Sequence, residues 1–315
     1  MRVPFIIPAA AGLAFDVVGL GQNSIDYVAV GAAPGAGSKQ RLDRFACLPG
    51  GQIATATVAC ARLGWRARYL GSFGDDQAGR LARESLTREG IDVSAARMVP
   101  GAASRVAVIL VDSRSGERTV LWYQDPALRL EPDAALLAAA VTGRLLLVDC
   151  DDLAASTAAA RAARQQRIPT MVDVEDVRPG TDALLRTIDA IVAAERFPSA
   201  LTGHPEPGRA LAAIEREYGA LLVCMTLGAE GSLARCGGRE IRTPGFAVDC
   251  VDSTGAGDVF RGAFAAGCLR WPEGEIEQVL TYANAAAALN CGGLGARGGI
   301  PDGEAIDRLI GSKSG

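Results

Sequence analysis

Residues 252–260 read Asp-Ser-Thr-Gly-Ala-Gly-Asp-Val-Phe, between a strand-like run at 246–251 and a helix that we expect over 255–269. The two glycines let backbone N–H groups come close to an anion, and the positive end of the helix dipole attracts phosphate charge. Asp258 would repel a phosphate bound there unless it accepts a proton from an attacking hydroxyl. The alternative role of Asp258 is to stabilise the helix dipole, and this stretch alone leaves both roles open.

From residue 15 onward, short β-rich runs alternate with alanine-rich helical runs. The clearest expected strands span 15–21, 67–71, 144–148, 170–174, 190–193 and 221–226. The clearest expected helices span 53–63, 77–89, 133–141, 155–166, 255–269 and 276–289. This order is typical of a doubly wound α/β fold, in which helices flank a mostly parallel sheet on both faces.

Two segments interrupt the alternation. Residues 27–49 are rich in glycine and proline and lack helical periodicity, and residues 105–123 read as two strands joined by a turn at 112–116. Together they predict a small β lid made of residues 27–49 and 103–125. The large α/β domain would then consist of residues 1–26, 50–102 and 126–315.

Composition narrows the class of protein. The 315 residues are 49% hydrophobic and carry a net charge of −4, so the chain can bury a large core but offers no general positive field for nucleic acid. No uninterrupted apolar segment is long enough to span a bilayer, and the apolar opening of the chain runs into a strand without a clear cleavage site. The eight cysteines form no C-x-x-C pair, which favours reduced thiols in a cytoplasmic protein. The single histidine, His204, lies in the turn-like stretch Thr-Gly-His-Pro-Glu-Pro-Gly at 202–208, so we expect neither a Ser-His-Asp triad nor a multi-histidine zinc site.

A second glycine-rich stretch changes the balance for Asp258. Residues 48–64 read Leu-Pro-Gly-Gly-Gln-Ile-Ala-Thr-Ala-Thr-Val-Ala-Cys-Ala-Arg-Leu-Gly and lead to Tyr-Leu-Gly-Ser-Phe-Gly-Asp-Asp-Gln-Ala-Gly at 69–79. The stretches around 50 and 255 resemble the two signature regions of the ribokinase or PfkB carbohydrate kinase family, in the same order and at a similar separation. The resemblance extends from Phe15 to Pro301. The lid sequence looks nearest to the ketohexokinase and sulfofructose kinase branches.

The resemblance implies an ATP-dependent transfer of the γ-phosphoryl group to a hydroxyl of a sugar. Asp258 matches the catalytic base of the family. The backbone amides of Gly255, Ala256 and Gly257 match its anion hole, which stabilises charge on the phosphoryl oxygens. The positions that match the nucleotide side are Thr226, Gly228, Gly231 and Asn284.

On the acceptor side, Asp26 matches the residue that binds the acceptor hydroxyl, and Gly50, Gly51 and Gln52 match the turn that holds the sugar. The family usually has Asn where this chain has Gln52, so the pocket should differ in shape. Arg105 lies where lid arginines of phosphosugar kinases bind an existing phosphate, and a guanidinium also suits a sulfonate. The alternative for Arg105 is a solvated strand arginine. The resemblance to these branches implies a ketose-like acceptor, which can be a free, a phosphorylated or a sulfonated sugar.

Metal sites follow less directly from the resemblance. Many family members carry N-x-x-E to organise Mg²⁺, whereas this chain has Ala-Glu-Arg-Phe at 194–197. Glu195 can substitute, and Asp173 or Glu175 can face the same cleft, although surface roles are equally compatible. We expect Mg²⁺ because ATP brings it. Asp252 and the loop at 292–298 match a K⁺ site of some relatives, with a capping role as the alternative for Asp252.

Other functions stay open at this point. The first alternative is a nucleoside kinase of the same family, and the second is a non-catalytic relative that binds a sugar or a nucleotide. A hydride-transferring dehydrogenase is a third, although the chain lacks the dinucleotide fingerprint. Exposed lid strands could also pair between two subunits, which predicts a homodimer.

Overall fold

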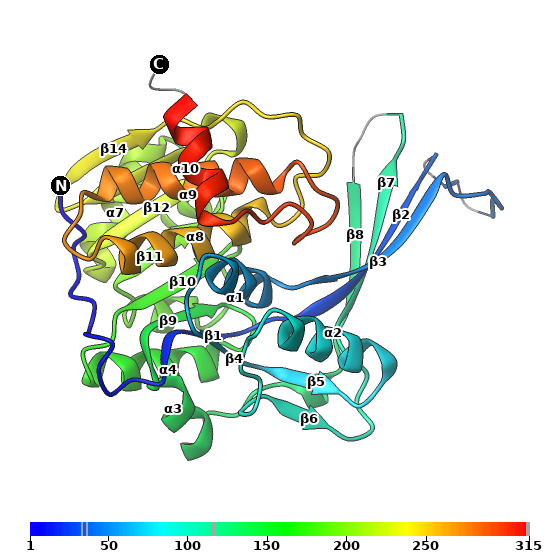
Figure 1. Cartoon of the computed structure of the whole chain (residues 1–315), viewed down its shortest axis with the longest axis horizontal. Coiled ribbons are helices and arrows are strands. Elements are labelled where there is room, and N and C mark those ends of the chain that lie inside the picture. The colour runs from blue at the N-terminus through cyan, green and yellow to red at the C-terminus, as the bar shows by residue number, and fades with distance from the viewer. Residues whose placement is uncertain (33, 36, 115–117, 313–315) are drawn as a thin grey trace.

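The computed structural model describes residues 1–32, 34–35, 37–114 and 118–312. Its body is an eight-stranded sheet covered by helices, and a second sheet projects from one side of that body (Figure 1). The strands of the main sheet lie in the order β14 (Arg239–Thr243), β13 (Ser232–Cys236), β12 (Leu222–Thr226), β11 (Ala190–Ala193), β10 (Thr170–Val174), β9 (Gly143–Asp149), β1 (Phe15–Leu20) and β4 (Ala67–Leu70). All pairs from β12 to β4 are parallel, and β13 and β14 are antiparallel.

The central strands are short apolar runs because both faces of the sheet are covered. In β1, Val17 belongs to the core on one face and Val18 to the core on the other. The first core contains buried residues of α1 (Gln52–Arg62), α2 (Gln77–Arg88), α8 (Ala256–Arg270), α9 (Ile276–Asn290) and α10 (Gly303–Ser312). The second contains buried residues of α3 (Ala134–Ala140), α4 (Leu153–Gln165), α5 (Thr181–Leu185), α6 (Phe197–Thr202) and α7 (Pro207–Tyr218). The doubly wound α/β fold predicted from the sequence is confirmed.

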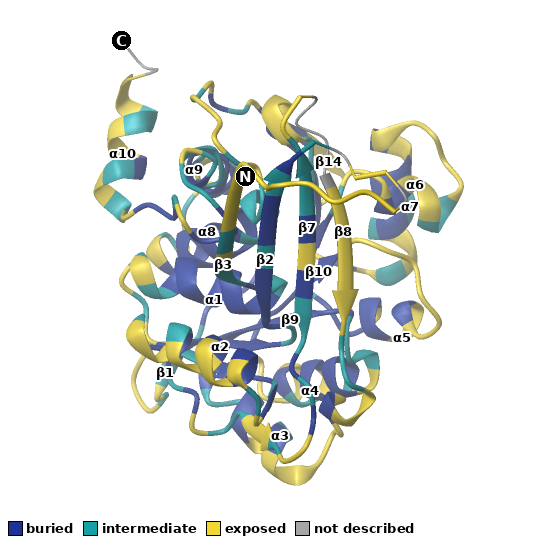
Figure 2. Ribbon diagram, turned by 90° about the vertical axis from the view of Figure 1, so that its right-hand side faces the viewer, coloured by how far each residue is buried: buried dark blue, intermediate teal, exposed yellow. Residues whose placement is uncertain are grey.

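The second sheet has the order β3 (Arg44–Gly50), β2 (Ser24–Gly31), β7 (Val106–Asp112) and β8 (Arg118–Tyr123). Strand β2 pairs with β7 in parallel, and β3 and β8 are antiparallel to their neighbours. Figure 2 shows β2 largely buried while β8 at the edge is exposed, in agreement with exposed Leu121, Trp122 and Tyr123. Because β2 follows β1 after a short turn, the end of the second sheet where β2 begins lies beside the carboxyl ends of the parallel strands of the main sheet.

The expected strands at 170–174 and 190–193 have the same limits in the structure, and the other expected strands and helices differ by one to a few residues at their ends. One expectation was wrong: residues 246–251 form no strand. Within that segment, Phe246, Ala247, Val248 and Cys250 line a cavity, so its apolar side chains have a function other than pairing in a sheet. Part of the expected turn at 112–116 lies outside the described residues. The short pair β5 (Ser72–Gly74) and β6 (Arg97–Val99) was not expected.

All eight cysteines are free thiols. In the described ranges we find no helix with the length and apolar character needed to cross a membrane.

Candidate active site

Two cavities meet at the turn that precedes α8. The first, here called the apolar cavity, has a volume of about 330 Å³ and is lined mainly by small and apolar residues between 226 and 291. The second, here called the acidic cavity, has a volume of about 320 Å³ and contains three carboxylates, from Asp26, Glu175 and Asp258. Ser253 and Gly257 line both cavities. A ligand in one cavity can therefore reach a ligand in the other across this turn.

The turn depends on backbone geometry that only glycine supplies easily. Gly255 begins α8 with a φ of 75°, and a Cβ there would lie 2.4 Å from the carbonyl oxygen of Ala296. Asp76 caps α2 through the N–H of Gly79, and Asp133 caps α3 in a similar way, whereas no side chain caps α8 in the described part of the chain. The positive end of the α8 dipole thus lies at the junction of the cavities, where Gly257 lines both of them, while the N–H of Ala256 donates to the Ser253 carbonyl oxygen at 3.3 Å.

Asp258 lies in the first turn of α8 and lines the acidic cavity. Burial raises the pKa of its carboxyl to about 7, the Arg261 guanidinium opposes that rise, and the negative charges of Glu175 and Asp26 add to it. Proton transfer at neutral pH is most efficient for a group with a pKa in this range. Asp258 is therefore suited to accept a proton from a hydroxyl in the acidic cavity.

Asp26, on β2, forms the opposite wall of the acidic cavity. Its carboxylate accepts a 2.7 Å hydrogen bond from the Ser24 hydroxyl, and burial raises its pKa. Gly50 passes so close that a Cβ on it would lie 2.1 Å from Oδ2 of Asp26. Gly51 has a φ of 88° and lines the cavity together with Gln52, the first residue of α1. Asp26, Gly51 and Gln52 thus line the acidic cavity, and Gly50 packs against the Asp26 carboxylate.

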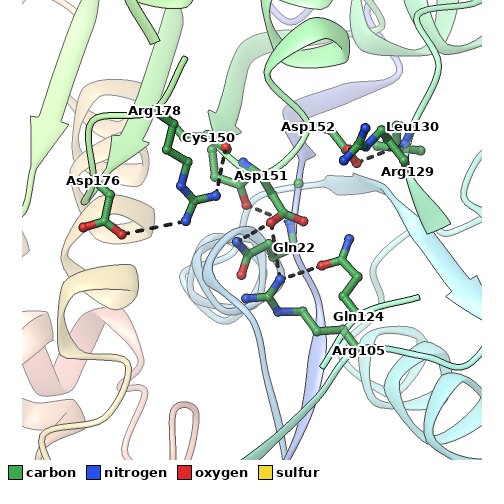
Figure 3. Close-up of polar contacts among 12 residues, drawn as sticks. Gln22, Arg105, Gln124, Arg129, Leu130, Cys150, Asp151, Asp152, Asp176 and Arg178 are labelled. Carbon is green, nitrogen blue, oxygen red and sulfur yellow. Dashed lines mark hydrogen bonds and ion pairs between the residues drawn. The ribbon is translucent and has the colours of Figure 1, made fainter. Parts of the chain in front are cut away.

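Arg105 lines the acidic cavity, but its charge is already paired (Figure 3). Its guanidinium donates to Oδ1 of Asp151 at 3.3 Å and to Oε1 of Gln124 at 2.5 Å. It also stacks on the Trp122 ring at 4.5 Å from the centroid. Gln22 donates to the same oxygen of Asp151 at 3.1 Å. With 15% of its side chain exposed, Arg105 is not a solvated strand arginine.

The apolar cavity is shaped by backbone and small side chains. Thr226 ends β12, Gly228 is the first residue of the 3₁₀ turn η2 (Gly228–Glu230), and Gly231 follows that turn. A Cβ on Gly231 would lie 2.2 Å from the carbonyl oxygen of Thr243, so the chain comes very close to itself here. Asn284 on α9 donates to the Ser232 hydroxyl at 3.0 Å, which fixes its amide beside the cavity. These four predicted positions lie in one cavity.

The candidate metal positions are dispersed. Glu195 is exposed after β11 and is not among the residues that line either cavity. Both Asp252 oxygens accept backbone N–H groups, from Thr254 at 2.9 Å and from Gly295 at 2.8 Å, as a capping residue would. Across the described residues, no group of three or more His, Cys, Asp or Glu side chains is arranged to hold a metal ion. Asp173 is buried, and only Glu175 of these acidic residues lines the acidic cavity.

Sequence reasoning missed two buried arginines. Arg297 donates to the Gly50 carbonyl oxygen at 2.6 Å and to the Thr55 hydroxyl at 3.2 Å, so it supports the turn beside Asp26. Arg261 forms an ion pair with Asp173 at 2.8 Å. The available signal for Arg261 was a charged residue within a helix composed mostly of small and apolar residues.

The chain is similar to known proteins along most of its length. The family model described as "pfkB family carbohydrate kinase" matches residues 15–303. The chain is 31% identical to the ATP-dependent ribose-1-phosphate kinase of Halopiger xanaduensis over 284 residues, which cover 83% of this chain and 86% of that protein. It is 28% identical to the ribokinase of Bacillus subtilis over 296 residues, which cover 92% and 98%. The structure of Arabidopsis thaliana ribokinase complexed with ribose and ATP superposes with a TM-score of 0.85 at 25% identity, covering 95% of this chain and 99% of that one.

Proposed function

The chain belongs to the pfkB family of carbohydrate kinases, and we propose that it transfers the γ-phosphoryl group of ATP to a hydroxyl of a ketose-like sugar with Asp258 as the general base. As a sugar kinase it is a phosphotransferase with an alcohol group as acceptor. The observation that carries the proposal for Asp258 is the shared wall of the two cavities. Gly257 lines both of them, and the next residue is a carboxylate with a pKa of about 7.

In the proposed reaction, ATP occupies the apolar cavity with its phosphates at the turn before α8. The acceptor hydroxyl lies between Asp26 and Asp258, and Asp258 takes its proton while the oxygen attacks phosphorus. The new O–P bond forms as the bond to ADP breaks, and the proton later leaves Asp258 for solvent. Backbone N–H groups of Gly255, Ala256 and Gly257 stabilise the negative charge on the transferred group.

Mg²⁺ would neutralise phosphate charge when ATP brings it, as in the family at large. Among the described residues, no group of three or more His, Cys, Asp or Glu side chains is arranged to hold a metal ion. The proposal also includes a K⁺ ion held by Asp252 and the loop at 292–298. A comparison of the phosphorylation rates in K⁺ and in Na⁺ tests this site.

The charges of the acidic cavity favour a neutral sugar over a phosphorylated or sulfonated one. Asp26, Glu175 and Asp258 face the cavity, and the only arginine that lines it, within the described residues, already pairs with Asp151. A sugar phosphate would have to displace that pair to gain a counter-ion. Free ketoses are therefore the acceptors that we place first.

Domain division and assembly complete the proposal. Residues 27–49 and 103–125 would act as a lid over the acidic cavity, which Val120 and Trp122 of β8 help to line. The exposed outer strand β8 would pair with a second copy in a homodimer. A cytoplasmic location would suit both ATP as the donor and eight free cysteines.

The test is a panel of free ketoses, aldoses, nucleosides, phosphosugars and sulfosugars, scored for acceptor-dependent ADP release and for the phosphorylated product. We expect a free ketose to give the highest kcat/KM. A higher kcat/KM for a nucleoside than for any sugar would indicate a nucleoside kinase of the same family instead. ATP binding without transfer to any sugar would overturn the proposal.

A further inference from the structure

A buried arginine lies directly under the junction of the two cavities. Arg261 follows Asp258 by one turn of α8, and its Nη1 lies 3.7 Å from Oδ1 of Asp258. Only 5% of the Arg261 side chain is exposed. A Cβ built on Gly257 would lie 2.7 Å from the same Nη1, so the guanidinium packs against the turn that lines both cavities.

The other side of this guanidinium is held by Asp173 of β10. Nη2 of Arg261 lies 2.8 Å from Oδ1 of Asp173, whose side chain is 2% exposed. Apart from this ion pair, neither oxygen of Asp173 has a hydrogen-bond partner within the described part of the chain. Arg261 is thus the partner of Asp173 among the described residues. The side chains of Asp173, Arg261 and Asp258 form a row that leads from β10 to the acidic cavity.

Such an arrangement is difficult to explain by stability alone. A buried ion pair often stabilises a fold no better than apolar residues of the same volume, because both charges lose their hydration. The Arg261 guanidinium places a positive charge at this position. A fixed charge below the first turn of α8 would act on any negative charge at the turn.

We propose that Arg261 is a positioning residue for phosphoryl transfer: anchored by Asp173, it keeps the Asp258 carboxylate ionised and oriented toward the acidic cavity. This inference rests on the proposed function for the role of Asp258. It assigns one role to each residue: the buried Asp173 carboxylate fixes the Arg261 guanidinium, and Arg261 fixes the Asp258 carboxylate. Arg261 does not itself touch either substrate.

The groups that act on Asp258 come from every surrounding element. Arg261 and Arg297 favour its ionised form, whereas burial and the charges of Glu175 and Asp26 oppose it. Burial raises the pKa of Asp173 as well, and an ionised Asp173 acts against ionisation of Asp258, because the two carboxylates repel each other and share one arginine. Of these groups only Arg261 is near Asp258 in an ion pair among the described residues. Removal of Arg261 should therefore have the largest effect.

The decisive measurement is the titration of the Asp258 carboxyl by ¹³C NMR in the full-length protein, with the resonance assigned by Asp258→Asn. Arg261→Met should raise the midpoint by about 1 to 3 pH units, and Arg261→Lys should raise it less. Asp173→Asn should lower it, because Arg261 then serves Asp258 alone. Arg270→Met is the matched control, since Arg270 lies on the same helix but pairs with the exposed Asp307.

Kinetics give a second readout with the acceptor that the panel identifies. Arg261→Met should lower kcat at pH 7 by about tenfold or more and regain most of it at pH 9, with the KM for ATP little changed. A purely structural role would not restore the rate with pH. If Arg261→Met does not fold, the double variant Arg261→Met, Asp173→Asn removes both buried charges, and its comparison with Asp173→Asn alone isolates the effect of the arginine.

An unchanged midpoint of Asp258 in Arg261→Met, or equal midpoints in the double variant and in Asp173→Asn, would overturn the inference while leaving the kinase proposal intact. A shifted midpoint in a protein that phosphorylates no sugar would instead retain the electrostatic role of Arg261 and defeat the proposed function. The two failures are therefore distinguishable.

Discussion

The apolar cavity and the acidic cavity share a wall but are built in different ways. Residues between 226 and 291 line the first, and many are glycines and alanines that act through their backbone. The second cavity is lined by polar and charged side chains among others, and its lining residues come from β2, β7 and β8 of the second sheet, from the residue after β10 and from α8. The shape of the apolar cavity depends on how closely backbone segments approach each other. The chemistry of the acidic cavity depends on which side chains line it.

This difference explains why the reaction is easier to infer than the acceptor. Close backbone approach requires glycine at fixed spacing, which leaves a local pattern in the sequence. A set of distant side chains leaves no such pattern, because each residue alone looks like an ordinary surface or core position.

The largest effect is expected where the cavities meet. Asp258→Asn should lower kcat by about 10² to 10⁴-fold, because the amide cannot accept the proton of the acceptor hydroxyl. The KM for ATP should change little, since the substitution acts on the chemical step. Steady-state kinetics with the identified acceptor provide the measurement. Near-normal turnover would remove Asp258 from the mechanism.

Glu175→Gln is the matched control for Asp258→Asn, because it removes a carboxylate charge from the same cavity. The negative charge of Glu175 helps to raise the pKa of Asp258. Its removal should therefore increase the rate at pH 6 relative to wild type, opposite in sign to Asp258→Asn. A comparable loss of kcat in both variants would indicate that charge in the cavity, and not one base, limits the reaction.

The backbone dependence of the apolar cavity is tested by two glycines of one turn. Gly231→Ala would place a Cβ 2.2 Å from the Thr243 carbonyl oxygen at a φ of 97°, whereas Gly228→Ala would meet nothing within 4 Å at a φ of 56°. We expect Gly231→Ala to raise the KM for ATP by about tenfold or more and to reduce stability. Gly228→Ala should cost only about 1 kcal/mol of backbone strain. ATP titrations and urea unfolding of both variants would show the contrast, and equal effects would contradict it.

Much of the fold could be predicted because buried parallel strands are apolar throughout and end at turns. The strands at 170–174 and 190–193 illustrate this, with limits that agree with β10 and β11. The prediction of a strand at 246–251 was wrong. The apolar side chains of this segment line a cavity, and hydrophobic periodicity cannot distinguish such a segment from a buried strand. Local signals thus predicted the strands well where burial came from the sheet itself.

The candidate site was predictable to a smaller extent. The glycines near 255 and 231 and the Asn284 position carried motifs, and they lie in or beside the apolar cavity. The pairing of Arg105 with Asp151, and of Arg261 with Asp173, joins residues far apart in the sequence, and neither pair left a local pattern. Contacts of this kind depend on the order of strands in the sheet, which the sequence alone did not supply.

A smaller effect is expected for Arg105, on the acceptor side only. Arg105→Met removes the pairing with Asp151 and the stacking on Trp122, so the wall of the acidic cavity should lose its order. The KM for the acceptor should rise about tenfold, equivalent to about 1.4 kcal/mol, with the KM for ATP unchanged.

Arg129→Met is the control for Arg105→Met, because Arg129 is exposed and lies near Asp152 in the same region (Figure 3). It should leave both KM values as in wild type. If Arg105→Met changed the KM for ATP as strongly as that for the acceptor, the two cavities would not be separable in the way proposed here.

The smallest effect comes from pH, and it should act in opposite directions on rate and stability through one carboxyl group. Because the pKa of Asp258 is raised to about 7, kcat should fall about fivefold between pH 7 and pH 6 as the base is protonated. The folded-state pKa lies above the unfolded value of 3.8, so the stability that the protonated carboxyl contributes is complete below pH 3.8 and is lost as pH rises through about 7. Urea unfolding at pH 5 and pH 8 should show wild type losing more stability than Asp258→Asn over this interval, by about 1 to 4 kcal/mol. Equal losses would mean that the carboxyl is ionised without cost in the folded protein, and the acidic cavity would then lack the property that makes Asp258 a base at neutral pH.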